Sequence, residues 1–280
     1  MAQDETGREL GRHERYRGDY PIVVEGLTNA FGEQVVHQDL DLKVKRGEIL
    51  GVVGGSGTGK SVLMRSIIGL QRPTAGDIRV FGKSIIDTDP NVHIGIRNRW
   101  GVLFQGGALF STLTVGENVE VPLKQFYPDI EPDLRHEIAR YKVVLSGLPE
   151  EAVNKYPSEL SGGMKKRAGL ARALALDPDI VFLDEPTSGL DPIGAAEFDE
   201  LIAKLRDTLG LTVYMVTHDL DSLFTVADRI AVLGEKRVLV VGTIKDMLKN
   251  EDPWVKSYFR GKRARQIVMP DQNTAAGAGG

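Results

Sequence analysis

Apolar and polar positions along the chain follow two periods, one typical of strands and one typical of helices. Short apolar runs with the character of buried strands occupy residues 49–53, 180–183, 212–216 and 229–233. Apolar residues at helical spacing between them predict amphipathic helices, as at Phe198, Leu201, Ile202, Leu205 and Leu209. Because strands that alternate with helices pair in parallel and are covered on both faces, this rhythm predicts an α/β fold with a mostly parallel sheet.

Other parts of the chain depart from this rhythm. From about residue 111 to 160, five prolines surround one predicted helix at 134–145, which we interpret as a helical lobe inserted into the α/β core. We expect residues 1–19 to form a mobile arm and the small, featureless residues 273–280 to be disordered. Further short strands are predicted at residues 21–24, 40–44, 77–81 and 101–104.

A glycine-rich loop follows the first buried strand and opens a helix, in the pattern G-x-x-x-x-G-K-[ST]. Its residues are Gly54, Gly55, Ser56, Gly57, Thr58, Gly59, Lys60 and Ser61. Glycines let the backbone bend around a polyphosphate, and the helix start adds partial positive charge. We expect Lys60 to reach the β- and γ-phosphates of a nucleotide and the Ser61 hydroxyl to bind Mg²⁺.

Polar side chains follow three other predicted strands. Asp184 and Glu185 come directly after residues 180–183, near the phosphate loop if the sheet is parallel. Asp184 suits Mg²⁺, and Glu185 is placed to polarise a water for attack on the γ-phosphate. His218 could sense that phosphate, and Gln105 could touch Mg²⁺ or the water. Taken alone, however, a histidine or glutamine at a strand end is more often an ordinary surface or core residue.

A second predicted anion-binding helix start lies at Ser161, Gly162 and Gly163. The helix that follows carries Lys165, Lys166, Arg167 and Arg172, and the cluster 165–167 is more often a solvated helix face than a phosphate or partner contact. One nucleotide has one γ-phosphate. The simplest geometry therefore places the second start against the nucleotide of another copy, in a head-to-tail dimer with two-fold symmetry.

The composition of the chain excludes several classes of protein. The chain has 280 residues, a net charge of −4 and no cysteine, which excludes disulfides and thiolate chemistry and provides no basic field for nonspecific nucleic-acid binding. The start lacks an apolar core, so we expect no secretory signal. No stretch approaches the roughly 20 apolar residues needed to cross a bilayer, so work at a membrane would require another subunit as anchor.

Together these motifs resemble the ATP-binding cassette (ABC) family over roughly residues 21–245. The resemblance implies a P-loop NTPase (RecA-like) core with an antiparallel β-subdomain and an inserted α-helical subdomain at about 111–165, within an ATPase domain at 20–250. Residues 251–280 would then be a partly disordered C-terminal extension. The implied activity is hydrolysis of ATP with Mg²⁺.

The resemblance also implies a role for each motif. Residues 54–61 correspond to Walker A, Gln105 to the Q-loop, 160–164 to the signature and 180–185 to Walker B with the catalytic Glu185. Residues 188–191 resemble the D-loop, which ends at Asp191, and His218 resembles the switch histidine. Ser61, Gln105 and Asp184 would hold the metal. Phe31 matches the aromatic that stacks on adenine, with a plain core phenylalanine as the alternative.

The fifth signature residue is Met164, where most cassettes have Gln. This departure, with residues 105–119 and 252–261, resembles the MlaF group of cassettes that serve MCE-protein lipid transporters. That group implies work at the cytoplasmic face of the bacterial inner membrane. Its implied partners are two integral permease subunits, an MCE-domain protein and often a STAS-domain protein.

Other interpretations remain open at this stage. They are a cassette of a solute importer or exporter, a soluble nucleic-acid-associated cassette ATPase and a non-hydrolysing regulatory cassette. The acidic net charge and the absence of cysteine speak against the second, and Glu185 and His218 against the third. The end of the chain carries a group of basic residues with three possible roles: a solubilising run, a contact to anionic lipid or a docking segment for the second cassette. These residues are Arg260, Lys262, Arg263 and Arg265.

Overall fold

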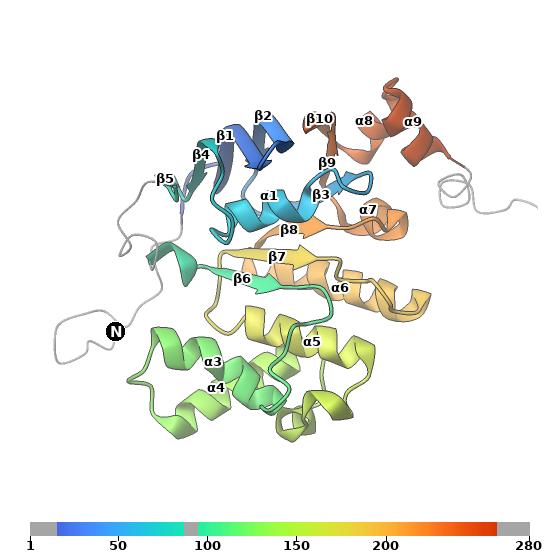
Figure 1. Cartoon of the computed structure of the whole chain (residues 1–280). Coiled ribbons are helices and arrows are strands. Elements are labelled where there is room, and N and C mark those ends of the chain that lie inside the picture. Colours follow the sequence, from blue (N-terminus) through green and yellow to red (C-terminus); the bar gives the residue numbers. More distant parts are fainter. Residues whose placement is uncertain (1–15, 87–94, 262–280) are drawn as a thin grey trace, which may run out of the picture.

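The computed structural model describes residues 16–86 and 95–261, and their elements are built around a six-stranded sheet (Figure 1). The strand order is β10-β9-β3-β8-β7-β6. Strands β9 through β6 pair in parallel, and β10 pairs antiparallel with β9. The predicted mostly parallel sheet is confirmed. Its strands are β3 (Ile49–Gly54), β6 (Trp100–Leu103), β7 (Ile180–Asp184), β8 (Thr212–Val216), β9 (Arg229–Gly234) and β10 (Arg237–Gly242).

Alternate residues of the central strands point to opposite faces of this sheet, and different helices cover each face. Phe182 packs in the core that contains α1 (Lys60–Ile67). Leu183, the next residue, packs in the core that contains α5 (Gly162–Ala173) and α6 (Pro192–Leu209). The phosphate-loop helix and the signature helix therefore lie on opposite faces of the sheet.

A smaller antiparallel sheet, in the order β2-β1-β4-β5, shares the core of α1. Its strands β1 and β2 are long and irregular in register, with bulges between their paired residues. Such bulges increase twist and let the sheet wrap over the helix. The expected antiparallel subdomain is confirmed. Its strands are β1 (Ile22–Phe31), β2 (Gln34–Val44), β4 (Ala75–Val80) and β5 (Lys83–Ser84).

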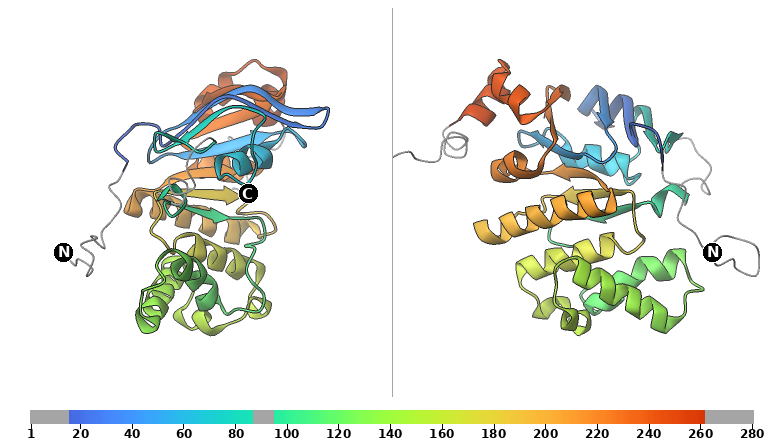
Figure 2. Two further views of the ribbon diagram at one scale, coloured as in Figure 1. Left: turned by 60° about the vertical axis from the view of Figure 1, so that its left-hand side comes forward. Right: turned by 180° about the vertical axis from the view of Figure 1, so that it is seen from behind.

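The helical lobe forms the end of the molecule opposite to α8 and α9 (Figures 1 and 2) and has its own apolar core. The prolines obscured one of its helices, because Pro122 lies inside α3. That helix begins with a capping box in which Thr114 and Glu117 each accept a backbone N–H of the other, which offsets part of the proline penalty. The lobe contains α3 (Val115–Phe126), α4 (Pro132–Leu145), η1 (Glu150–Asn154) and η2 (Pro157–Glu159).

The chain returns to the sheet through β10 and ends its described part in two helices. They are α8 (Ile244–Lys249) and α9 (Pro253–Arg260), and α7 (Leu220–Val226) lies in the same apolar core. Val255 and Phe259 of α9 are fully buried there. Residues 1–15 and 262–280, which include most of the predicted arm and of the basic tail, lie outside the described residues. No helix of the described ranges has the length and apolar character needed to cross a membrane.

Candidate functional site

The phosphate loop joins β3 to α1 through backbone conformations that favour glycine. Gly57 and Gly59 have φ angles of 78° and 89°, in the left-handed region where a side chain is strained. A Cβ on Gly59 would also lie 2.3 Å from Nε2 of the buried His37. The motif therefore needs glycine at position 59 for two separate reasons.

The Lys60 ammonium lies within this loop, where it donates hydrogen bonds to the carbonyls of Gly54 at 2.8 Å and Gly55 at 3.0 Å. Burial lowers the pKa of Lys60, and the carboxylates of Glu185 and Asp184 oppose that shift. The lysine is therefore electrostatically coupled to the acidic pair at the end of β7.

Four of the predicted residues follow strand ends at one edge of the sheet. Gln105 follows β6, Asp184 and Glu185 follow or end β7, and His218 follows β8. Because these strands are parallel, their carboxyl ends meet at the edge where β3 enters the phosphate loop. Parallel pairing thus gathers side chains that are more than 100 residues apart in the sequence.

Glu185 and His218 are in direct contact, with 2.7 Å between Oε2 of the carboxylate and Nδ1 of the imidazole. The Glu185 side chain is 16% exposed and that of His218 is 71% exposed. A largely enclosed carboxylate beside a solvent-facing imidazole is an arrangement suited to proton transfer and to sensing a ligand.

The backbone of Glu185 has a φ of 51°, a conformation that costs a non-glycine residue on the order of 1 kcal/mol. Four hydrogen bonds hold it there. Its N–H donates to the Val216 carbonyl at 2.9 Å. Its carbonyl accepts from the Ser188 N–H at 3.2 Å, from Ser188 Oγ at 2.9 Å and from Lys166 Nζ at 2.8 Å. The strained residue is thus fixed by β8, by the loop after β7 and by the signature helix.

Asp184 is buried, and burial followed by the neighbouring Glu185 raises the pKa of its carboxyl, while Arg65 and Lys60 oppose the shift. A divalent cation beside Asp184 would stabilise the charged carboxylate and so offset the cost of burying it. The hydroxyl of Ser61, the carboxylate of Asp184 and the amide of Gln105 supply only oxygen donors near the loop, the ligand type that Mg²⁺ prefers. The donor types of these three residues therefore fit a magnesium ion.

The signature residues start α5, where Ser161 is the N-cap and its hydroxyl accepts the N–H of Met164 at 3.2 Å. Ser161 and Gly162 are exposed. No hydrogen bond or ion pair among the described residues joins Ser161, Gly162 or Gly163 to the phosphate loop, so the structure does not bring these two predicted sites together within one chain.

Lys166 corrects the interpretation of residues 165–167 as a solvated helix face. Its side chain is buried, and Nζ donates to the Glu185 carbonyl and, at 3.0 Å, to Ser188 Oγ. Burial lowers the pKa of Lys166 to about 8, against the attraction of Glu185. Arg172, from the same helix, donates to the carbonyls of Ala108 and Gly107 in the loop after β6.

Two other predicted residues lie at element ends. Phe31 closes β1 and is 46% exposed, which argues against the alternative of a plain core phenylalanine. Asp191 is the N-cap of α6 and accepts the N–H groups of Ile193 and Gly194. The hydrogen bond from Gly194 is the main reason that the pKa of Asp191 is lowered.

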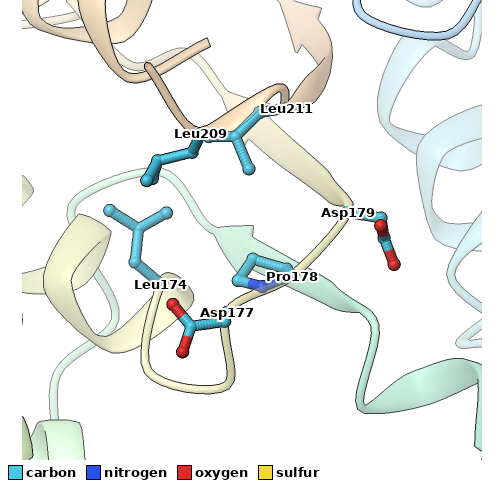
Figure 3. A pocket seen from close by; sticks show the side chains of 6 residues that line it. All are labelled: Leu174, Asp177, Pro178, Asp179, Leu209 and Leu211. Carbon is cyan, nitrogen blue, oxygen red and sulfur yellow. The ribbon is translucent and has the colours of Figure 1, made fainter. Parts of the chain in front are cut away.

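A surface pocket lies at the opposite edge of the sheet, before β7 and β8 begin (Figure 3). Leucine side chains from the residue after α5, from the end of α6 and from the segment before β8 gather there, and the side chain of Asp179 points away from them. None of these residues belongs to the predicted site. The pocket is lined by Leu174, Asp177, Pro178, Asp179, Leu209 and Leu211.

The sequence and the fold have clear counterparts among known proteins. The sequence matches the family described as ABC transporter over residues 37–188. A cassette titled a dimeric post-hydrolysis state of MJ0796 bound to ADP and Pi has a TM-score of 0.72 and 32% identity, covering 79% of this chain and 98% of that one. The cassette cbiO1 from Clostridium perfringens has a TM-score of 0.75 and 29% identity, covering 90% and 99%.

This chain belongs to the ABC transporter family, and it is an ATP-binding, ATP-hydrolysing cassette. Among curated relatives, the probable ribonucleotide transport ATP-binding protein mkl of Mycobacterium tuberculosis is 39% identical over 91% of this chain and 70% of its own length. The intermembrane phospholipid transport system ATP-binding protein MlaF is 36% identical in Haemophilus influenzae, over 86% and 90% of the two chains, and in Escherichia coli, over 82% and 85%. The resemblance to the MlaF group is confirmed.

Sequence reasoning missed several residues that contact the site. They come from β2, from the interior of α5 and from α9. The available signals were a histidine that directly follows two valines of a β-branched run and aromatic residues four apart in the stretch 252–261. The residues are His37, Lys166, Trp254 and Tyr258.

Proposed function

We propose that this chain is the ATPase subunit of a bacterial ABC transporter that moves phospholipid between the inner and outer membranes. The contact between Glu185 and His218 beside the phosphate loop is the observation that carries the ATPase mechanism. The 36% identity to proteins named MlaF supports the lipid cargo.

ATP binding begins at residues 54–61. Lys60 leaves the carbonyls that it now contacts and binds the β- and γ-phosphates, while N–H groups at the start of α1 face the same phosphates. Phe31 stacks on the adenine ring. Ser61, Asp184 and Gln105 would hold Mg²⁺, which neutralises the developing charge on the phosphates when bound.

Hydrolysis depends on the carboxylate of Glu185. Oε2 is held by Nδ1 of His218, so the attacking water is bound and polarised at Oε1. The imidazole of His218 then lies beside the γ-phosphate and responds to its departure. The four hydrogen bonds on the Glu185 backbone keep this geometry fixed during turnover.

A second copy of the chain completes each site in this proposal. Ser161, Gly162 and Gly163 begin a helix that has no phosphate partner in its own chain, and they suit the γ-phosphate bound by the other copy. Asp191 lies beside the same interface. The structures of the cassette MJ0796, which are titled as dimeric, support a dimer of this chain.

The loop after Gln105 is suited to carry movement from the nucleotide site to the permease subunits. Arg172 ties the carbonyls of Gly107 and Ala108 to the signature helix, so a movement of α5 on nucleotide binding reaches this loop. We place the cassette at the cytoplasmic face of the inner membrane, with integral permeases, an MCE-domain protein and a STAS-domain protein as partners.

The decisive variant is Glu185→Gln in the full chain with Mg²⁺ and ATP. Loss of the general base is expected to lower steady-state hydrolysis by about a hundredfold or more while ATP still binds. Size-exclusion chromatography should then show a trapped dimer. Lys60→Ala is the control, and calorimetry should show that it loses nucleotide affinity. Turnover like that of the wild type in Glu185→Gln would contradict the role of Glu185.

A solute transporter cassette is the second candidate, because the 39% identical relatives are named ribonucleotide transport proteins. The proteins that copurify with the cassette distinguish a lipid transporter from a solute transporter. A permease that copurifies with an MCE-domain protein supports lipid transport, whereas a periplasmic solute-binding protein in the same complex supports the alternative.

A further inference from the structure

Helix α9 is packed against the strand that feeds the phosphate loop. Val255 and Phe259 are fully buried in one core with Val53, the residue before Gly54, and with Ile230 of β9. Figures 1 and 2 show α9 beside α8, at the end of the molecule away from the helical lobe. The two buried side chains fix how α9 is rotated about its axis, and therefore which residues it presents to the site.

The presented residues are an aromatic pair. The rings of Trp254 and Tyr258 stack with 4.8 Å between centroids and 13° between planes, and Tyr258 meets Phe259 edge-on at 5.0 Å. Nε1 of Trp254 lies 3.7 Å from the point where a Cβ on Gly55 would stand. Trp254 thus lies against the phosphate loop as well as against Tyr258.

The Tyr258 hydroxyl donates a hydrogen bond to the backbone carbonyl of His218 at 3.0 Å. Burial, with smaller contributions from the carboxylates of Glu185 and Asp219, raises the pKa of Tyr258 to about 12. The phenol is therefore a hydrogen-bond donor throughout the physiological range. Tyr258, which is 40 positions further along the chain, is therefore hydrogen-bonded to the backbone of the switch histidine.

We propose that Tyr258 is a positioning residue for hydrolysis, which holds the His218 backbone so that the imidazole faces the Glu185 carboxylate. The proposal rests on the proposed function of that pair. His218 has a largely exposed side chain, so its own packing restricts it little. The hydrogen bond from Tyr258 fixes the backbone end, and the 2.7 Å contact to Glu185 fixes the ring end.

The test is Tyr258→Phe in the full chain, a change that keeps the stacked ring and removes only the hydroxyl. We expect kcat for ATP to fall about five-fold, the value of one lost neutral hydrogen bond, with KM unchanged. Amide hydrogen exchange in the segment 217–220 should become faster while α6 keeps its protection. Tyr141→Phe, on the outer surface of α4 and 60% exposed, is the matched control and should change neither.

Unchanged kcat together with unchanged exchange in 217–220 would overturn the proposal. A fall in kcat with faster exchange across the whole molecule would also overturn it, because that pattern means general loosening. The exchange measurement needs no turnover. It therefore separates this inference from the ATPase mechanism, which fails if the wild-type chain and Glu185→Gln hydrolyse ATP equally.

Discussion

The most constrained residue of the site is Glu185, whose carbonyl accepts three hydrogen bonds at once. One donor, Lys166, comes from the signature helix. In a dimer that helix would face the partner's nucleotide, whereas Glu185 would act on its own. Lys166 would therefore connect two different reaction centres through a single side chain.

Replacing Lys166 with methionine tests this connection. The Glu185 carbonyl keeps its hydrogen bond from Ser188, so we expect little change in thermal stability. Loss of the charged donor loosens the catalytic residue, and kcat should fall about ten-fold, as for a charge-assisted hydrogen bond, with ATP affinity retained. Lys204→Met, at an exposed position of α6, is the control. Equal kcat values for the two variants would show that Lys166 has no catalytic role.

Individual residues also show where sequence reasoning stops. The loop at 54–61 and the strand ends at Asp184 and His218 follow from local pattern and from parallel pairing. The contacts of Lys166 and Tyr258 do not. Each is made by one long side chain to a backbone carbonyl 19 or 40 residues away, and no local periodicity encodes such a contact.

At the scale of elements, a buried carboxylate lies between α6 and α7. Asp199 of α6 is 4% exposed and hydrogen-bonds with Ser222 of α7. Burial, with smaller contributions from Asp219 and Asp221, raises the pKa of Asp199 from 3.8 to about 6. The charged form is therefore disfavoured in the folded state.

This shift predicts a pH-dependent stability. Because the folded pKa lies above the unfolded one, the stabilising contribution of Asp199 is complete below about pH 4 and is lost as the pH rises through 6. Asp199→Asn does not titrate, so it should be more stable than the wild type at pH 7.5, by on the order of 3 kcal/mol. That advantage should vanish near pH 4. Urea unfolding at pH 7.5 and at pH 4 measures the difference in stability between Asp199→Asn and the wild type, and Glu200→Gln, at an exposed position, is the control. The same difference at both pH values would refute the prediction.

Among the elements, central strands and amphipathic helices were predictable because their apolar periods are unbroken. Helix α3 was not, since Pro122 interrupts its pattern and its stability comes from the capping box and the lobe core. The strand β10 contains four consecutive apolar residues, Val238–Val241, so it was predictable on the same ground, although no strand was predicted there.

At the scale of the whole molecule, the described chain has four apolar cores, and the last of them depends on α9. We compare a chain that ends after Gly261 with one that ends after Asp252. The shorter chain lacks Val255 and Phe259, both fully buried. It should be less stable by about 4 kcal/mol, the value of two buried apolar side chains. Denaturant unfolding checks this, and equal midpoints for the two chains would contradict the packing.

The position of α9 also has a consequence for protein synthesis. Val53, next to the phosphate loop, is covered by side chains that the ribosome adds about 200 residues later. At typical elongation rates, that interval is roughly 10 to 40 s. A nascent cassette therefore exposes the apolar support of its nucleotide loop until α9 has been synthesised and has docked on Val53.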